Sequence, residues 1–318
     1  MAKLITGGTG YIAAELAHIF VERGEEVVLF DVAINEYRVE DIKNKVKLVS
    51  GDLGNFPEVA NVVKDNKITE IYHMGGLLTL VSDRNPWASI RVNVIGTYNV
   101  LEAARLFSVT QIMFASSIGT YGLGISDVID DLTIQRPTNL YGIGKLYCEG
   151  LGRWYMNKFG LDFRSIRYPA MVGPGVRTPG HWIPPMIEDA VLGRPHECLY
   201  ASADDTGTPI IYLTDAARAA DIVLQAPKEQ IKMVNYCVSG MPEAVSTNDM
   251  ETILRKRYPK TTISYRSPLK GLVGGVKRFD DSCARNEWGW KPLYTTPEAV
   301  VGKFEKDMKE HPKRFGLE

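Results

Sequence analysis

Cysteine is scarce in this sequence, and no two cysteines lie close together. Cys148, Cys198, Cys237 and Cys283 are the four cysteines in 318 residues, whereas zinc sites and disulfide frameworks place cysteines at short, repeated spacings. The five histidines have no metal-ligand spacing either. The sequence therefore predicts no metal site and no disulfide framework, and it favours reduced thiols in a cytoplasmic protein.

An excess of charge and long apolar runs are missing as well. Lysine plus arginine number 37 against 38 for aspartate plus glutamate, so the net charge of -1 provides no overall field to hold nucleic acid or an anionic membrane. No stretch approaches the roughly 20 apolar residues of a membrane-spanning helix. The first apolar run is too short for an export signal. We expect a compact globular protein whose partner is a small molecule.

The first half of the chain alternates short apolar runs with longer helical patterns. The runs that favour strands cover 3–6, 26–31, 46–50, 70–74, 111–116 and 162–168, and the patterns that favour helices cover 10–23, 56–66, 86–107 and 138–159. Such alternation is typical of βαβ units. The sequence therefore predicts an α/β fold with a Rossmann-type, doubly wound parallel sheet.

The regular alternation ends after Tyr168, where proline and glycine cluster. The later elements that we expect are shorter: helices at 183–192, 215–225, 247–258 and 297–309, and strands at 210–213 and 233–238. We predict a nucleotide-binding domain over 1–168, to which segments such as 209–238 return. Residues 169–318 are expected to form mainly a smaller substrate-binding lobe.

A glycine-rich turn joins the first expected strand to the first expected helix. It reads Thr6-Gly7-Gly8-Thr9-Gly10-Tyr11-Ile12-Ala13. Gly7 and Gly10 would let the backbone approach a dinucleotide pyrophosphate, to which N–H groups at Tyr11 and Ile12 could donate. Asp31 ends the second strand, where its carboxylate could accept hydrogen bonds from the adenosine ribose and would repel a 2′-phosphate. The pattern predicts NAD as the cofactor.

Two further turns could border this cofactor. Asp52 and Leu53 follow the third strand and could lie beside the adenine, and Gly75 follows the fourth strand, where a glycine permits close approach of the backbone. Each also fits ordinary turn chemistry. His73 lies next to this last turn, and we interpret it as a structural residue.

Tyr141 and Lys145 are four residues apart at the start of a predicted helix, so they share one helix face. A phenol has a pKa near 10, but an adjacent ammonium and a bound nicotinamide cation would both favour the phenolate. Lowering this pKa by about three units takes roughly 4 kcal/mol. The pair is therefore a candidate for removing a proton from an alcohol, with Tyr141 as the base.

A serine pair ends the fifth strand, at the edge of the sheet where open α/β folds bind ligands. We expect the Ser117 hydroxyl to hold the substrate oxygen, with Ser116 and Thr120 as neighbours that contact substrate or nicotinamide. Arg177 and Arg218 could meet a carboxylate or phosphate on the substrate, or could be ordinary solvated charges.

Taken together, these residues resemble the extended short-chain dehydrogenase/reductase family. The matching motifs also include His73-Met74-Gly75-Gly76, Val92-Asn93-Val94-Ile95-Gly96-Thr97 and Arg167-Tyr168-Pro169. The resemblance implies Ser117, Tyr141 and Lys145 as the catalytic set, with Tyr141, Lys145 and Tyr168 beside NAD(P) and Asn93 as a structural support. It also implies a homodimer formed by helices 86–107 and 138–159.

Within this family the chain is most similar to the threonine-dehydrogenase branch. The stretches Ile210-Ile211-Tyr212-Leu213-Thr214-Asp215-Ala216 and Asn286-Glu287-Trp288-Gly289-Trp290-Lys291-Pro292 carry that similarity. The branch usually has a Gly/Thr-rich turn beside the substrate amino acid, where this chain has Thr178-Pro179-Gly180-His181-Trp182. We therefore expect His181 and Trp182, with Ser116, Ser117, Thr120 and Tyr141, to contact the substrate.

The resemblance implies NAD-dependent oxidation of a secondary alcohol, such as L-threonine or a related β-hydroxy acid or alcohol. The alternative is a nucleotide-sugar epimerase or dehydratase of the same family. Those enzymes tend to have an Asn after the sixth strand, where this chain has Pro169-Ala170-Met171. A regulator that senses NAD(H) without catalysis would have little need for the intact catalytic set.

Overall fold

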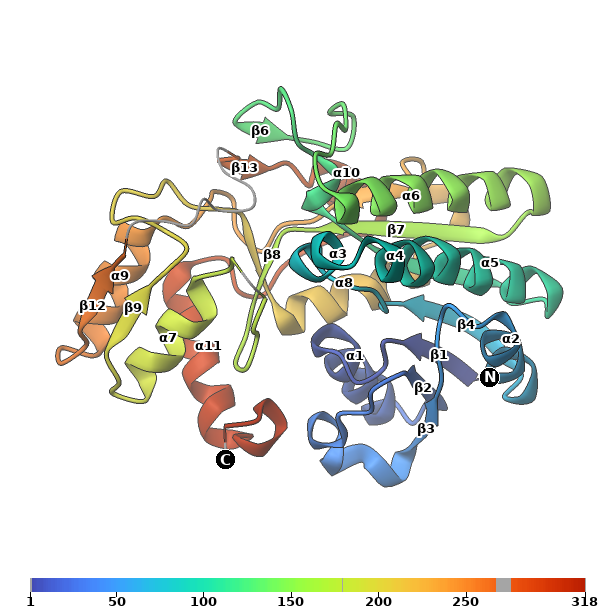
Figure 1. Ribbon diagram of the computed structural model, residues 1–318, viewed down its shortest axis with the longest axis horizontal. Helices are drawn as coiled ribbons and strands as arrows, with labels where there is room; N and C mark the ends of the chain where they lie inside the picture. Colours follow the sequence, from blue (N-terminus) through green and yellow to red (C-terminus); the bar gives the residue numbers. More distant parts are fainter. Residues whose placement is uncertain (1, 179, 267–275, 318) are drawn as a thin grey trace.

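The computed structural model describes residues 2–178, 180–266 and 276–317. At its centre is a parallel seven-stranded sheet with the order β11-β7-β5-β4-β1-β2-β3 (Figure 1). The strands are β1 (Ala2–Thr6), β2 (Val27–Asp31), β3 (Val46–Ser50), β4 (Ile68–His73), β5 (Gln111–Ser117), β7 (Asp162–Tyr168) and β11 (Asn235–Cys237). Strand order reverses between β1 and β4, which confirms the predicted doubly wound Rossmann fold.

Helices cover both faces of this sheet, because successive strand residues point to opposite sides. Ile5 and Leu29 pack in a core with α1 (Tyr11–Glu22) and α8 (Leu213–Gln225). Their neighbours Leu4 and Val28 belong to a second core. That core is covered by α2 (Phe56–Asp65), α5 (Gly96–Leu106) and α6 (Leu140–Phe159).

The helical pattern predicted over 86–107 is confirmed, but it contains a change of winding. It begins as α4 (Pro86–Ser89), continues through a π-helical turn, η3 (Ile90–Ile95), and ends as α5. A short helix before it, α3 (Thr79–Arg84), has no clear periodicity in the sequence. No described helix is both long and apolar enough to cross a bilayer.

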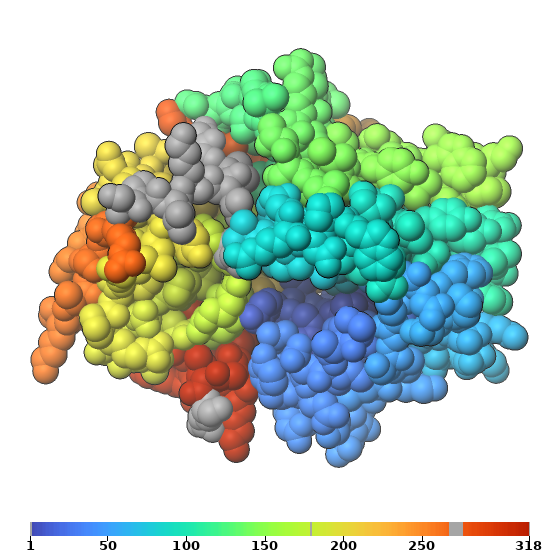
Figure 2. All heavy atoms as spheres, in the orientation of Figure 1, coloured from blue at the N-terminus to red at the C-terminus, as the bar shows by residue number. Residues whose placement is uncertain are grey.

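The second half of the chain builds a smaller lobe beside the sheet (Figures 1 and 2). It contains two two-stranded pairs: β8 (Ala170–Val172) with β10 (Ile210–Tyr212), and β9 (His196–Cys198) with β12 (Ile263–Tyr265). A third pair, β6 (Val128–Ile129) with β13 (Arg278–Phe279), packs in a separate cluster with Ile118 and Cys237. The helices of the lobe are α7 (Ile183–Val191), α9 (Thr247–Arg257) and α11 (Pro297–Glu310), whereas α10 (Ser282–Trp288) packs beside β11 on the main sheet.

This lobe has its own apolar core, formed between α7, α9 and α11. Elements of the second half also pack on the main sheet, since β11 pairs with β7 and α8 lies beside α1. The division into 1–168 and 169–318 stays a prediction.

Candidate functional site

The glycine turn after β1 forms a narrow cradle at the point where the strand order reverses. Gly7 has a φ of +61°, and a Cβ added to it would lie 2.7 Å from the Cα of Gly75. Gly10 directly precedes α1 as its N-cap residue and has an extended backbone, and no side chain caps this helix. Because the first N–H groups of a helix lack internal partners, they can donate to a phosphate. The cradle therefore fits the pyrophosphate of a dinucleotide.

Asp31 lies at the end of β2 beside this cradle and is partly exposed. Its Oδ2 accepts hydrogen bonds from the backbone N and the hydroxyl of Thr9, at 3.1 and 2.9 Å, and its Oδ1 accepts one from Ala33 N at 3.2 Å. These bonds fix the carboxylate and leave lone pairs for further donors. The placement fits recognition of a ribose diol.

The other predicted cofactor residues have partners within the protein. Asp52 forms an ion pair with Arg91 at 2.6 Å, so its carboxylate is already engaged. Leu53 is buried, and its side chain lies 2.6 Å from a Cβ placed on Gly75. The Tyr11 hydroxyl donates to the carbonyl of Gly175 and so joins the turn to the lobe.

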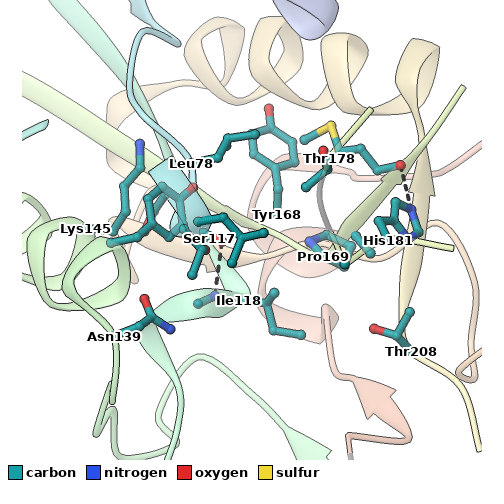
Figure 3. A pocket seen from close by; sticks show the side chains of 18 of the residues that line it. Leu78, Ser117, Ile118, Asn139, Lys145, Tyr168, Pro169, Thr178, His181 and Thr208 are labelled. Carbon is teal, nitrogen blue, oxygen red and sulfur yellow. Dashed lines mark hydrogen bonds between the residues drawn. The ribbon is translucent and has the colours of Figure 1, made fainter. Parts of the chain in front are cut away.

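A cavity of about 340 Å³ lies between the carboxyl edge of the sheet and the lobe (Figure 3). Segments 115–119, 168–171, 180–182 and 205–208 contribute to its lining. Eight predicted site residues line it: Ile12, Ser116, Ser117, Tyr141, Lys145, Tyr168, His181 and Trp182. The glycine cradle, Tyr11, Asp31, Asp52, Leu53 and Thr120 are not part of this lining.

Close packing brings Tyr141 against Ser117. Asn139 caps α6 by accepting a hydrogen bond from Gly142 N at 2.8 Å. A Cβ added to Gly142 would lie 1.9 Å from the carbonyl oxygen of Gly119, so only glycine permits this approach of the helix to the turn after β5. A Cβ on Gly119 would lie 3.3 Å from the Tyr141 ring and 3.4 Å from Ser117 Oγ. Both side chains therefore border the same point of the cavity.

Lys145 lies one turn farther along α6 and points to the same edge. Its Nζ donates to the carbonyl of Ala115 at 2.6 Å and lies 5.7 Å from the centre of the Tyr141 ring. Desolvation lowers the pKa of Lys145 to about 8. A Cβ added to Gly76 would lie 3.7 Å from this amine, so Lys145 also borders the glycine pair that follows β4.

The protonation of Tyr141 differs from the sequence-based expectation. Desolvation inside the cavity raises the pKa of the Tyr141 phenol, and the neighbouring Ser117 hydroxyl opposes this rise. The Lys145 amine donates to the Ala115 carbonyl and lies 5.7 Å from the centre of the Tyr141 ring. A phenolate at neutral pH therefore needs a further positive charge, such as that of a bound nicotinamide.

Two of the expected substrate contacts have hydroxyls that are engaged elsewhere. The buried Ser116 donates to Oε1 of Glu149 at 2.6 Å, and Arg167 holds both oxygens of that carboxylate at 2.9 and 2.8 Å. The buried Thr120 donates to the carbonyl of Ser117 at 3.0 Å. Both hydroxyls stabilise the end of β5 from behind the cavity.

The remaining predicted residues divide between the cavity and the framework. The Tyr168 hydroxyl donates to the Ala216 carbonyl at 2.9 Å, although the residue lines the cavity. Arg177 pairs with the buried Glu188, and Arg218 pairs with the buried Asp215 at 2.7 Å. Neither arginine lines the cavity, so their charges belong to the framework.

Structural supports surround the site. His73 is buried, and its ring nitrogens contact the hydroxyls of Thr6 and Thr97 at 2.6 and 3.0 Å. The side chain of Asn93, in the π-helical turn, accepts from Leu77 N at 2.7 Å and donates to Leu77 O at 2.9 Å. It thereby fixes the segment that follows β4.

Sequence reasoning missed several parts of the cavity wall. Leu78 on the segment before α3, Asn139 at the start of α6, and the loop residues Asp205 and Thr208 all line it. Only Asn139 had a usable signal, because Asn is favoured directly before a helix. Within the described residues, no group of three or more His, Cys, Asp or Glu side chains could hold a metal ion.

Comparison with known proteins agrees with this geometry. Residues 3–238 match the NAD dependent epimerase/dehydratase family. The mitochondrial L-threonine 3-dehydrogenase of Bos taurus is 30% identical over 308 residues, covering 94% of this chain and 80% of that protein. An uncharacterized epimerase/dehydratase of Staphylococcus epidermidis is 30% identical over 328 residues, covering 96% and 98%.

Among solved structures, the chain is similar to a GalE-like L-threonine dehydrogenase from Cupriavidus necator in its holo form. The TM-score is 0.88 at 27% identity, covering 97% of this chain and 100% of that one. A UDP-glucose 4-epimerase from Thermotoga maritima shares the fold, with a TM-score of 0.83 at 20% identity, covering 97% and 100%. The chain belongs to the NAD dependent epimerase/dehydratase family, as an NAD-dependent dehydrogenase.

Proposed function

We propose that the protein oxidises a secondary alcohol, with Tyr141 as the base, Ser117 as the group that holds the alcohol oxygen, and Lys145 as the cation beside them. The observation that carries this proposal is the meeting of Ser117 and Tyr141 at Gly119, on the wall of a cavity next to a glycine cradle. The proposed roles use the geometry of the sheet edge and need no residue from the lobe.

Each side chain has a distinct task in this reaction. When bound, NAD supplies the hydride acceptor. Tyr141 removes the hydroxyl proton, and Ser117 hydrogen-bonds the oxygen as its charge develops. Lys145 lies beside Gly76 and keeps a positive charge near both the cofactor edge and the phenol. The desolvated cavity strengthens both of these interactions.

NAD rather than NADP is the proposed cofactor. The Asp31 carboxylate would accept hydrogen bonds from a ribose diol and would repel a 2′-phosphate. Arg38 is the nearby cation, but it donates to the Thr9 carbonyl at 2.7 Å and stacks 4.0 Å above the Tyr11 ring. This engagement leaves Asp31 as the charge that faces the ribose.

The substrate screen that tests the proposal follows NADH absorbance with L-threonine, other β-hydroxy acids, simple secondary alcohols and sugar alcohols in parallel. L-threonine is included because it is the substrate named for the dehydrogenase relatives. Oxidation of at least one alcohol supports the proposal. Epimerisation of a nucleotide sugar without net NADH release would contradict it and favour the epimerase alternative.

A homodimer is the proposed assembly. The joined helices α4, η3 and α5 and the helix α6 expose large apolar side chains, including Trp87 at 72%, Ile95 at 44%, Ile143 at 50% and Trp154 at 51%. Such a surface is typical of a protein interface. Sedimentation velocity is expected to give a dimer, and a Trp154→Glu variant is expected to give a monomer. The cytoplasmic location stays a prediction, supported by four free cysteines.

A further inference from the structure

The wall of the cavity opposite Lys145 holds a histidine with one nitrogen fixed (Figure 3). His181 Nε2 lies 2.8 Å from the carbonyl oxygen of Met171. A carbonyl oxygen only accepts hydrogen bonds, so Nε2 carries a hydrogen, and in a neutral ring Nδ1 is then the acceptor. Desolvation lowers the pKa of His181 to about 4, so the ring is neutral at pH 7. This wall therefore offers a neutral acceptor to a ligand.

The segment around His181 holds this orientation. Gly180 has a φ of +87°, which favours glycine, and His181 N donates to the Thr178 carbonyl at 3.0 Å. Among the described residues, Nδ1 has no hydrogen-bond partner. A group on the substrate is thus free to fill that position.

Charge on this side of the cavity disfavours a carboxylate. Within the described lining, Lys145 is the only lysine or arginine. Its amine donates to the carbonyl of Ala115, at the reacting end of the cavity. Arg177 is held by Glu188 outside the lining. Asp205 lines the lobe side and contributes a negative charge. Among the described residues on this side, a substrate carboxylate would lose water without gaining a cation.

Apolar side chains connect the two ends of the cavity. Leu78, Leu80, Ile118, Met171 and Trp182 line the space between the sheet edge and the lobe. They favour a hydrocarbon skeleton over a charged one. The reacting hydroxyl and a second polar group would then lie at opposite ends of a short apolar chain.

We propose that the substrate is an uncharged secondary alcohol with a second hydroxyl, which donates to His181 Nδ1, rather than a β-hydroxy acid. This inference rests on the proposed function and names the substrate class of the same site. One hydroxyl becomes a ketone: its proton passes to Tyr141 and its carbinol hydrogen leaves as hydride to NAD. The second hydroxyl is unchanged and serves only for recognition.

The experiment compares diols of increasing spacing with the matching monoalcohols and with two acids. The diols are 2,3-butanediol, 2,4-pentanediol and 2,5-hexanediol, the monoalcohols are 2-butanol, 2-pentanol and 2-hexanol, and the acids are L-threonine and 3-hydroxybutyrate. For at least one spacing, kcat/KM of the diol is expected to exceed that of its monoalcohol and of both acids by about tenfold or more. The advantage should appear in KM more than in kcat.

A His181→Phe variant tests the assigned residue. The ratio of diol to monoalcohol kcat/KM should fall to about one, because the ring remains but the acceptor is lost. His311→Phe makes the same exchange at an exposed position outside the cavity and should leave this ratio unchanged. A diol advantage that survives in His181→Phe overturns the assignment.

The outcomes separate this inference from the proposed function. If L-threonine or 3-hydroxybutyrate has a higher kcat/KM than every diol, the inference is wrong and the dehydrogenase function stands. If NADH binds by fluorescence titration but no compound is oxidised, the proposed function fails and the inference fails with it. The panel on the unsubstituted protein gives these outcomes even if His181→Phe does not fold.

Discussion

The two walls of the cavity are built in different ways. On the sheet side, Ser117 ends a central strand, and Tyr141 and Lys145 share one face of a twenty-residue helix. On the lobe side, His181 and Thr208 lie in loops before α7 and β10. The sheet wall is tied together by contacts to backbone atoms, such as the bond of Lys145 to Ala115.

This difference separates the reaction from the choice of substrate. The sheet wall uses elements that the family fold requires, so its chemistry can stay constant while loops in the lobe change. The lobe wall can accept another side chain without disturbing the sheet, since the hydrogen bonds that His181 makes with described residues go to its own loop and to the neighbouring β8. Substitutions on the two walls should therefore have different kinetic signatures.

The largest expected effect comes from Tyr141→Phe, which removes the base from the sheet wall. Turnover should fall by about 10³-fold, because a positioned base contributes roughly 10²–10⁴. The factor should be the same for every alcohol oxidised, while NADH binding by fluorescence stays intact. Tyr147→Phe, at an exposed position on the same helix, is the control. If the loss of turnover differs from one alcohol to another, the two walls do not have separate roles in reaction and substrate choice.

Asp31→Ser should change the cofactor preference and leave the substrate ranking alone. The ratio of kcat/KM for NAD over NADP is expected to fall by about 10²-fold, because the hydrogen bonds to the ribose and the repulsion of a phosphate are both lost. Glu36→Gln, which removes an acidic group paired with Lys43, is the control. A changed ranking of alcohols would show that the cofactor end and the lobe wall are coupled.

The sequence predicted the sheet wall better than the lobe wall for a physical reason. Helical periodicity alone places Tyr141 and Lys145 on one face, and the end of a strand places Ser117 at the sheet edge. Asp205 and Thr208 reach the cavity through loops that have no periodicity. The lining role of Leu78 depends on packing between segments distant in sequence.

The sequence also could not predict how deeply the site residues are buried or which partners their side chains bind. The pKa of Tyr141 depends on desolvation, which only the folded cavity determines. Arg218 donates hydrogen bonds to Asp215 and to the carbonyl of Lys291, and Lys291 lies 73 residues away in the sequence. Ser116 and Ser117 look equivalent in sequence, but strand alternation points them to opposite sides.

Low pH should decrease the free energy of unfolding through His73, which is buried beside the sheet wall. Burial lowers the pKa of His73 from 6.5 to about 3 in the folded protein, so the unfolded chain binds more protons between these values. Stability is unaffected above pH 6.5 and falls as the pH decreases, by about 2 kcal/mol at pH 5. Urea unfolding at pH 7 and pH 5 measures this loss. His73→Gln cannot titrate, so it should lower stability at both pH values and reduce the difference between them by that amount.

The smallest expected effect distinguishes the two adjacent serines at the end of β5. Ser116→Ala should lower the free energy of unfolding by about 1 kcal/mol, because it removes one hydrogen bond to the buried Glu149. Turnover should change little, since Arg167 still holds both carboxylate oxygens. Ser117→Ala is the matched comparison. It also removes one hydrogen bond, the one that Ser117 Oγ accepts from Gly119 N at 3.0 Å, so its change in stability should be similar, but it should lower kcat by about 10²-fold. If Ser116→Ala loses as much turnover as Ser117→Ala, then the hydrogen bond from Ser116 to Glu149 also helps to position the reacting hydroxyl. The buried network behind β5 and the cavity wall in front of it would then act as one unit.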